Sequence, residues 1–361
     1  MKSVYIHIPF CKQKCRYCSF ISYPKLEFKD KYIESLKTEI KERYKGEVLE
    51  TLYIGGGTPS LLSSEEIFSL IELFNTKSDT EITIELNPET ITAKYLSEFK
   101  NTGINRLSFG CQTFNDDILK QIGRIHSSDD VINSIKFAQD AGFKSISLDF
   151  IYGLPNQTVK MFENDLQKTI TLDISHISLY GLKIDKDCYF YKNPPENLPD
   201  EDIQADMYLK AIEILSSKGF EHYEISNFSK KGFESKHNLN YWNNGTYYGF
   251  GCAAHGYENG VRYSNKSKLE DYIANPLIHE NFHNLTEREK LEEEIFLGFR
   301  RISGINVEEI NRKYKIDFRE KYKKVLDKYV SYNFLKETSD GFKLTKEGIL
   351  ISNNILSEFL Q

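Results

Sequence analysis

The sequence predicts an α/β protein: an open, partial parallel β/α barrel of about six units, followed by a small winged-helix-like domain. Short apolar runs alternate with amphipathic helical patterns through the first half of the chain. Because six units are fewer than the roughly eight of a closed barrel, the barrel should stay open. Near the C-terminal end, two helical patterns precede a hairpin, which is the order of elements in a winged helix.

Six strands are expected in the first half of the chain, each separated from the next by a helical pattern. Strand, helix, strand repeats of this spacing imply right-handed crossovers and a parallel sheet. Among the helices, one begins near Ser64 with acidic residues in its first turn, and another ends at Gly142 in a C-cap position. The expected strands are residues 4–8, 51–54, 81–86, 106–110, 145–150 and 176–180, and the clearest helices are 29–44 and 129–141.

The regular alternation stops after the sixth strand, which divides the chain into three parts. Residues 1–185 form the parallel core, residues 186–284 are an extension that closes the barrel, and residues 285–361 form the C-terminal domain. In the last two parts the expected elements are helices at 201–218, 287–300 and 307–314 and strands at 223–225, 334–336 and 342–344.

Composition and charge exclude several classes of protein. The chain has 361 residues and a net charge of −6 with scattered basic residues, which disfavours nucleic-acid binding. No apolar run approaches the roughly 18–20 residues that span a bilayer, and the start has no signal-peptide layout, so we expect a cytoplasmic protein. Six cysteines in such a protein are ligands or buried thiols. Cys111, Cys188 and Cys252 lack ligand-like spacing and are assigned to packing.

The other three cysteines, Cys11, Cys15 and Cys18, follow the first strand. Three thiolates at this spacing can hold three corners of a cubane iron–sulfur cluster and leave the fourth iron open to a chelating ligand. Structural zinc is an alternative, but it wants four protein ligands, commonly as two CxxC pairs, and no fourth cysteine lies nearby. Buried thiols are the other alternative.

Polar and small residues fall at the carboxyl ends of the predicted strands. Cys11 follows the first strand and Gly55–Thr58 the second, and Glu85, Gln112 and Asp149 follow the next three. In parallel α/β architectures, ligands bind at this edge of the sheet. Each residue alone has an ordinary explanation, since a triple glycine is often a turn and a glutamate often ends a strand. Together they predict a ligand site.

A family resemblance extends through most of the predicted barrel. Cys11, Cys15 and Cys18, with the aromatic Tyr17 between the last two, resemble the CxxxCxφC motif of the radical S-adenosylmethionine (SAM) superfamily, where φ is aromatic. YIHIPF before the motif and GGGTP after the second strand resemble the branch related to oxygen-independent coproporphyrinogen III oxidase. The resemblance covers residues 4 to about 265 and continues through ELNPET, NRLSFGCQTFND, GRIH, LDFIYGLPNQT, HISLYGL and YEISNF.

The resemblance implies that the three cysteines hold a [4Fe–4S] cluster whose open iron is chelated by SAM. One electron would then cleave SAM to a 5′-deoxyadenosyl radical. The glycines would admit backbone donors to the amine and carboxylate of SAM, Glu85 would accept from the ribose hydroxyls, and Arg124 would pair with a carboxylate. The residues that the resemblance places around SAM are Tyr5, Tyr17, Gly56, Gly57, Thr58, Glu85, Gln112, Arg124 and Asp149.

Two features separate the chain from the oxidase itself. Phe20 stands where the oxidase has a cysteine two residues past its third cluster ligand, and only ten residues precede Cys11. Both features resemble instead the HemW group of haem chaperones, as does the segment from His237 to Trp242, which reads HNxxYW.

In the HemW group the HNxxYW motif is associated with haem binding. The resemblance therefore makes His237 the expected axial haem ligand, with Tyr241 and Trp242 packing on the macrocycle. From the residues alone, a surface loop whose aromatic side chains dock on the barrel remains an alternative. His255 is another potential ligand or hydrogen-bond donor.

We interpret the chain as a cytoplasmic haem chaperone that binds haem, SAM and a [4Fe–4S] cluster. It would deliver haem to a respiratory, membrane-associated haemoprotein through peripheral contact, since nothing in the sequence anchors it. The competing interpretation is a catalyst that converts coproporphyrinogen III to protoporphyrinogen IX or acts on another tetrapyrrole. A third, in which the winged helix reads nucleic acid, is disfavoured by the acidic balance.

Overall fold

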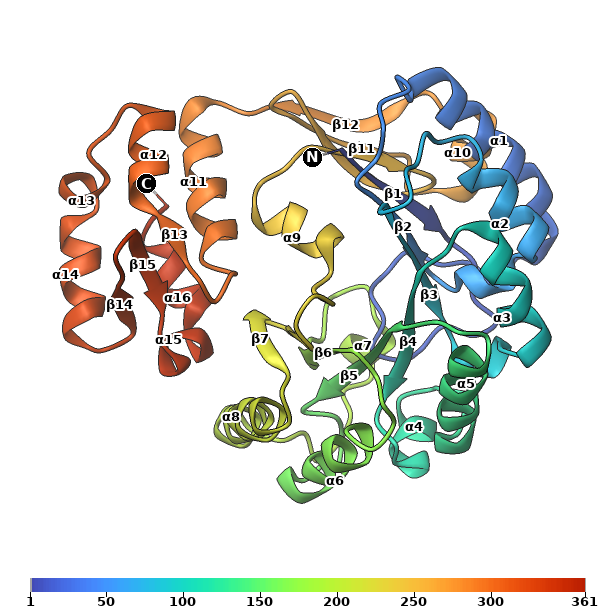
Figure 1. Cartoon of the computed structure of the whole chain (residues 1–361), viewed down its shortest axis with the longest axis horizontal. Helices are drawn as coiled ribbons and strands as arrows, with labels where there is room; N and C mark the ends of the chain where they lie inside the picture. Colours follow the sequence, from blue (N-terminus) through green and yellow to red (C-terminus); the bar gives the residue numbers. More distant parts are fainter. Residues whose placement is uncertain (1, 361) are drawn as a thin grey trace.

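The computed structural model describes residues 2–360, and its largest feature is one curved sheet of 12 strands. Six parallel strands, β1 to β6, lie side by side in chain order, which confirms the predicted six-unit open barrel (Figure 1). Their bounds are β1 (Ser3–Ile8), β2 (Thr51–Gly56), β3 (Glu81–Leu86), β4 (Arg106–Gln112), β5 (Ser145–Tyr152) and β6 (His176–Gly181).

Helices cover the outer face of these strands, as Figure 1 shows. Helices α2 and α5 begin with capping boxes at Ser63 and Ser127, and Gly142, with a φ of +82°, follows α5 as expected. The bounds are α1 (Lys29–Arg43), α2 (Ser64–Ile71), α3 (Ala93–Phe99), α4 (Asp116–Gln121), α5 (Ser128–Asp140), α6 (Val159–Thr169) and α8 (Glu201–Ser217).

The alternation of side chains along each strand separates core from cavity. Apolar residues such as Ile6 and Ile54 are fully buried in the hydrophobic core. The intervening residues, among them Tyr53, Glu85 and Asp149, face the inside of the barrel and line a cavity there. The interior of this barrel is therefore polar enough to hold a charged ligand.

The extension of residues 186–284 does not close the barrel as we predicted. Strands β7 and β8 pair beside β6, and β9 takes the free edge of β1 and leads into β10–β12, so β7 and β12 are the edges of an open sheet. Both edges that a closed barrel would join are thus occupied by further strands. The bounds are α7 (Tyr189–Lys192), β7 (Glu221–Glu224), β8 (Asn227–Ser229), β9 (Tyr247–Phe250), β10 (His255–Glu258), β11 (Val261–Asn265), α10 (Leu269–Ala274) and β12 (His279–Asn284).

Helix α9 (Lys236–Trp242), which carries the HNxxYW motif, lies inside the ring of strands in Figure 1. The backbone N–H groups of Lys236 and His237 both donate to the carboxylate of Glu81, at 3.0 Å. Glu81 is the first residue of β3, so α9 sits at the amino ends of the parallel strands. A negative side chain at the start of a helix is also electrostatically favourable.

The C-terminal residues form a separate small unit with its own three-stranded sheet, β13-β15-β14 (Figure 1). Phe299, Phe318, Tyr322 and Phe359 pack together in its core. The order of helices and hairpin follows the prediction. The bounds are α11 (Glu287–Gly298), β13 (Ile305–Asn306), α12 (Val307–Tyr314), α13 (Phe318–Lys321), α14 (Lys323–Ser331), β14 (Leu335–Glu337), β15 (Gly341–Leu344), α15 (Lys346–Leu350) and α16 (Ser352–Ser357).

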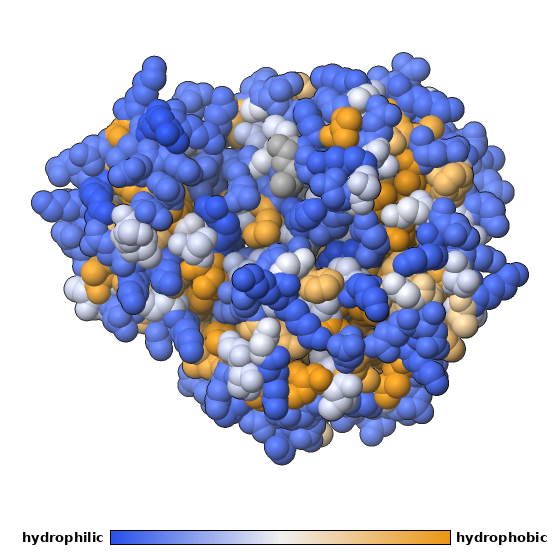
Figure 2. All heavy atoms as spheres, viewed as in Figure 1, coloured by the Kyte–Doolittle hydropathy of each residue, from blue (hydrophilic) through white to orange (hydrophobic). Residues whose placement is uncertain are grey.

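The face seen in Figure 2 is mostly hydrophilic, with small apolar patches between polar side chains. Among the helices within residues 2–360, none has the length and apolar character that crossing a membrane requires.

Candidate functional site

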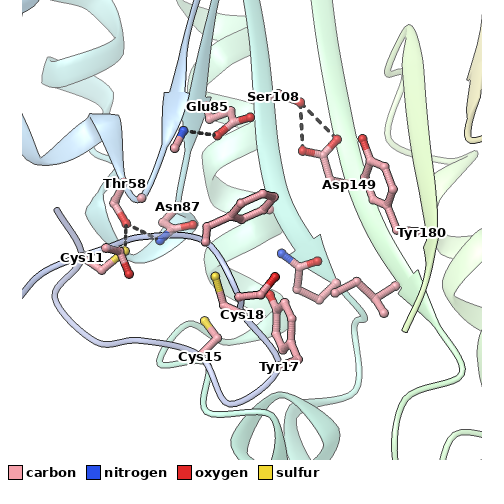
Figure 3. Close-up of a pocket in the computed structure, with 18 of the residues that line it drawn as sticks. Cys11, Cys15, Tyr17, Cys18, Thr58, Glu85, Asn87, Ser108, Asp149 and Tyr180 are labelled. Carbon is pink, nitrogen blue, oxygen red and sulfur yellow. Dashed lines mark hydrogen bonds between the residues drawn. The ribbon is translucent and has the colours of Figure 1, made fainter. Parts of the chain in front are cut away.

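A cavity of about 540 Å³ lies at the carboxyl ends of β1–β6 (Figure 3). Its wall combines the loop after β1 with side chains from the inner face of the sheet. The lining includes Cys11, Cys15 and Cys18 and all the residues that the resemblance placed around SAM except Tyr5. Residues from six separate strand ends therefore meet in one place, as the strand-end pattern predicted. We call this the cysteine cavity.

Two donors point at the cysteine sulfurs. The Thr58 hydroxyl donates to Cys11 Sγ at 3.5 Å, and Arg124 Nη1 donates to Cys15 Sγ at 3.6 Å. Burial raises the pKa of the Cys11 thiol, and it raises the pKa of the Cys18 thiol to about 11. Thiolate ligands would therefore form as iron binds and displaces their protons.

The three cysteines lie around one cavity, without converging on a single point. Across residues 2–360, no three Cys, His, Asp or Glu side chains come close enough together to hold one ion. The three thiols nevertheless line the same cavity. A cubane spreads its ligands over separate corners, so its thiolates need not converge on one point.

The glycine run brings the end of β2 close to the cysteine loop. Gly56 has a φ of +116°, which favours glycine, and an added Cβ would lie 2.7 Å from the His7 ring. At Gly57 an added Cβ would lie 2.6 Å from the carbonyl oxygen of Phe10. The N–H groups of these glycines are engaged within the protein, with Glu85 and Ile8 respectively. The glycines thus provide close packing of backbone on backbone.

The carboxylate of Glu85 is held from two sides at the end of β3. Tyr53 Oη donates to Oε1 at 2.8 Å, and the N–H of Gly56 donates to Oε2 at 3.0 Å. Burial, with a smaller contribution from Asp149, raises the pKa of Glu85 to about 7. When ionised, this carboxylate has lone pairs left to accept hydrogen bonds from a diol in the cavity.

Asp149 faces Glu85 across the inner surface of the sheet. The hydroxyl of Ser108 donates to both of its oxygens, at 3.1 and 3.0 Å (Figure 3). Burial raises the pKa of Asp149, while the nearby guanidinium of Arg106 opposes that shift. The cavity therefore holds two half-buried carboxyl groups whose charge a cationic ligand would stabilise.

Gln112 enters the cavity through an irregularity in β4. The pairing register with β5 shifts between Gly110 and Gln112, and Gln112 has a φ of +66°. A residue other than glycine in this region is strained by about 1–3 kcal/mol, and such strain clusters at functional sites. The bulge aims the Gln112 side chain at the cavity.

Asn87 is a site residue that the sequence analysis missed. Its Nδ2 donates to Thr58 Oγ1, and its Oδ1 accepts from Arg124 Nη2, both at 2.9 Å. Asn87 lies directly after the third strand, within ELNPET, and a polar residue at a strand end is the sequence feature that indicates a site residue. Other lining residues that we did not predict are Tyr53, Arg106, Ser108, Tyr180 and Asn238.

Tyr5 lies in a second cavity, of about 440 Å³, next to the first. Its ring stacks on Tyr53, which lines the cysteine cavity, with 6.1 Å between the ring centroids. Packing of Tyr5 on SAM stays a prediction. The second cavity, which we call the tyrosine cavity, is lined by Tyr5, His7, Ser19, Phe20, Ile21, Tyr241, Tyr247, Ala253, His255, Ser264, Asn265, Ser267, Glu280 and Asn281.

His237 of the HNxxYW motif lies at the amino ends of the strands, opposite the end that the cysteines follow, while Asn238 and Tyr241 of the same motif reach the cysteine cavity and the tyrosine cavity respectively. His237 is 1% exposed, and its ring stacks on Tyr53 with 5.0 Å between centroids. Its Nδ1 is hydrogen-bonded to Thr51 Oγ1 at 2.8 Å and its Nε2 to Tyr241 Oη at 2.9 Å. Tyr241 lines the tyrosine cavity, whereas Trp242 lines neither cavity. The structure thus does not bring His237 and the cysteines together.

The remaining cysteines behave as predicted, since Cys111, Cys188 and Cys252 are all buried free thiols.

The open barrel and the three-cysteine cavity at its strand ends define a protein of the radical SAM class. Residues 5–169 match the model of the radical SAM superfamily, and residues 285–351 match that of the HemN C-terminal domain. The solved structure of coproporphyrinogen III oxidase (HemN) from Escherichia coli has the same fold. Its TM-score is 0.88 over 100% of this chain and 90% of that chain, at 22% identity.

Relatives along the whole chain narrow the class further. The heme chaperone HemW of Bacillus subtilis is 38% identical over 378 residues, which cover 100% of this chain and 99% of that one. The heme chaperone HemW of Lactococcus lactis is 37% identical, over 99% of this chain and 97% of its own length. The chain belongs to the HemW family of the radical SAM superfamily.

Proposed function

We propose that this protein is a haem chaperone: it binds haem and a SAM-coordinated [4Fe–4S] cluster and delivers haem to haemoproteins. The observation that carries the proposal is the similarity along the whole chain to relatives that are themselves named heme chaperones. Phe20, on the cysteine loop where coproporphyrinogen oxidases have a further cysteine, supports a carrier over a catalyst.

The residues of the cysteine cavity suit the binding of a [4Fe–4S] cluster and SAM. Cys11, Cys15 and Cys18 would ligate the cluster, and the donors on Thr58 and Arg124 would stabilise the thiolates. When bound, the cluster supplies the electron for reductive cleavage of SAM.

The carboxyl groups and the polar side chains of the same cavity would hold SAM. Glu85 would accept hydrogen bonds from the ribose, and Asp149 would add negative charge that favours a cationic ligand such as SAM. Tyr17, Gln112 and Arg124 complete the wall. The bulge would turn the Gln112 side chain toward SAM, and the close contact at Gly57 would hold the end of β2 next to the cysteine loop.

We place the chaperone in the cytoplasm, where it would load a respiratory haemoprotein by peripheral contact at the membrane. No part of the chain is needed within the bilayer for such a transfer.

The experiment that tests the function is an anaerobic haem titration of the cluster-reconstituted protein. Soret absorbance and quenching of Trp242, the single tryptophan, report binding. We expect saturation near one haem per chain, followed by transfer to an added apo-cytochrome b. If the protein shows no saturable haem binding but converts coproporphyrinogen III in the presence of SAM, it is a catalyst and the proposal is wrong.

A further inference from the structure

We propose that haem binds in the tyrosine cavity, beside the SAM site, with His255 as its axial ligand in place of His237. This inference rests on the proposed haem-binding function and specifies where on this chain the haem would lie. It assigns the HNxxYW motif a different task, that of building one wall of the cavity.

His237 is poorly placed to ligate iron. Both of its ring nitrogens are already hydrogen-bonded, to Thr51 and Tyr241, and the ring is stacked on Tyr53. Burial lowers the pKa of His237 to about 3, so the ring is neutral and fixed within the protein. Ligation through either nitrogen would break one of these bonds and leave a buried hydroxyl without its partner, which is costly.

His255 has the opposite properties. It is the first residue of β10, its side chain is exposed, and it lines the tyrosine cavity. Within residues 2–360 neither of its ring nitrogens takes part in a hydrogen bond. His7 also lines this cavity, but its nitrogens are bonded to Tyr5 Oη at 2.9 Å and to the carbonyl oxygen of Ile21 at 3.1 Å. His255 is therefore the histidine of this cavity with lone pairs free for a metal.

The rest of the cavity wall suits a flat aromatic macrocycle. Phe20 is 68% exposed, which is unusual for a large apolar side chain and is explained if a ligand covers it. Tyr241 and Tyr247 meet edge to face, with 4.6 Å between their centroids, and Tyr5 adds a further ring. Aromatic rings in such arrangements stack on other π-systems.

The HNxxYW motif contributes Tyr241 to the wall of the tyrosine cavity. The hydrogen bond from its hydroxyl to His237 holds the ring at the cavity wall, so His237 acts as a positioning residue. Ser19 and Phe20, which directly follow Cys18, line both cavities. Haem in the tyrosine cavity and SAM in the cysteine cavity would thus both contact Ser19 and Phe20.

The test compares three histidine variants of the full-length, cluster-reconstituted protein in anaerobic haem titrations. His255→Gln removes the proposed ligand, and His237→Gln removes the positioning residue. His283→Gln is a matched control, because His283 is exposed on β12 and bonded to Glu289 at 2.9 Å, and it lines neither cavity. Soret absorbance gives the affinity, and magnetic circular dichroism and electron paramagnetic resonance identify an imidazole ligand.

We expect His255→Gln to weaken haem binding by at least about 10-fold, which is the effect of losing even an outer-shell partner of a metal ligand. The variant should also lose the imidazole signature. Added imidazole should restore that signature in His255→Gly. His283→Gln should behave as the native protein, and His237→Gln should keep an imidazole-ligated spectrum while melting at a lower temperature.

Native affinity and spectrum in His255→Gln would overturn the inference. Loss of the signature in a folded, cluster-loaded His237→Gln with His255 intact would do the same and make His237 the ligand. Failure of the native protein to bind haem at all would instead overturn the proposed function, so the two failures are distinguishable.

Discussion

Arg124 and Asn87 are joined by a hydrogen bond of 2.9 Å, from Arg124 Nη2 to Asn87 Oδ1. Asn87 in turn donates to Thr58, so side chains link Cys11 to Cys15 without interruption: Cys11, Thr58, Asn87, Arg124, Cys15. Two of the proposed cluster ligands and the positive charge between them are thereby held as one unit. A fixed cation beside a cluster stabilises the more negative, reduced state.

Replacing Arg124 with glutamine should therefore lower the reduction potential of the reconstituted cluster. A hydrogen bond to a charged group contributes about 1.5–3 kcal/mol, so a shift of about 60 mV or more is expected for a one-electron couple. An anaerobic titration followed by electron paramagnetic resonance measures it. Arg16→Gln, on the exposed part of the cysteine loop, is the control and should leave the potential unchanged. Equal potentials in the two variants would refute the role of Arg124.

Gly57→Ala should impair cluster loading. An added Cβ would lie 2.6 Å from the Phe10 carbonyl oxygen and 3.0 Å from that of Ile8, so the end of β2 would be pushed away from the end of β1 and from the start of the cysteine loop. We expect a loss of stability of about 1–3 kcal/mol and less iron and sulfide per chain. Gly219→Ala is the control for backbone strain alone: a Cβ there meets no atom within 4 Å, but the φ of +81° disfavours alanine, so this variant should lose stability and still load iron. A full complement of iron in Gly57→Ala would contradict the packing argument.

Glu85→Gln should weaken SAM binding by about 10-fold or more, the effect of losing a hydrogen bond to a charged group. Since burial raises the pKa of Glu85 to about 7, the accepting carboxylate forms as the pH rises through that value. SAM affinity measured by calorimetry should therefore increase between pH 6 and pH 8, and the variant should lose this increase. Glu81→Gln, at the other end of the same strand, should keep it. An identical pH profile in Glu85→Gln would show that another group titrates.

Glu224 should make stability fall as the pH rises. Its carboxyl is fully buried where β7 pairs with Arg301, and burial raises its pKa from 4.5 to about 7. Between those values the folded state holds a proton that the unfolded state has released, so stability is lost as pH increases through this window, by about 3 kcal/mol at most. In Glu224→Gln the melting temperature, measured from pH 4 to pH 8, should depend less on pH than in the native protein. Glu221 is exposed on the same strand, and Glu221→Gln should keep the native pH dependence.

Local periodicity was enough to predict the parallel core and most of its site. Apolar runs such as residues 51–54 and 81–86 set the strands, and in a parallel sheet the residues after them must meet at one edge. Glu85 and Asp149 could therefore be placed together from their positions alone. Asn87 lies at the same kind of position and would have been found by applying the rule to every polar residue at a strand end.

What the sequence did not show depends on contacts between distant residues. β9 pairs with β1 across more than 200 residues, and its segment YYGF has no alternation that distinguishes a strand from a turn. The burial of His237 depends on Thr51 and Tyr53, which no local pattern connects to it. Likewise, the bulge that turns Gln112 inward arises from register with β5.

The open sheet also sets an order of assembly during translation. Every residue that lines the cysteine cavity except Asn238 lies within the first 185 residues, so that wall can form while the rest of the chain is still on the ribosome. The tyrosine cavity needs residues of β9 to β12 as well as β1, so its wall is incomplete until Asn281 has been made. A nascent chain would therefore form the wall of the proposed cluster site before it forms the cavity in which we propose that haem binds.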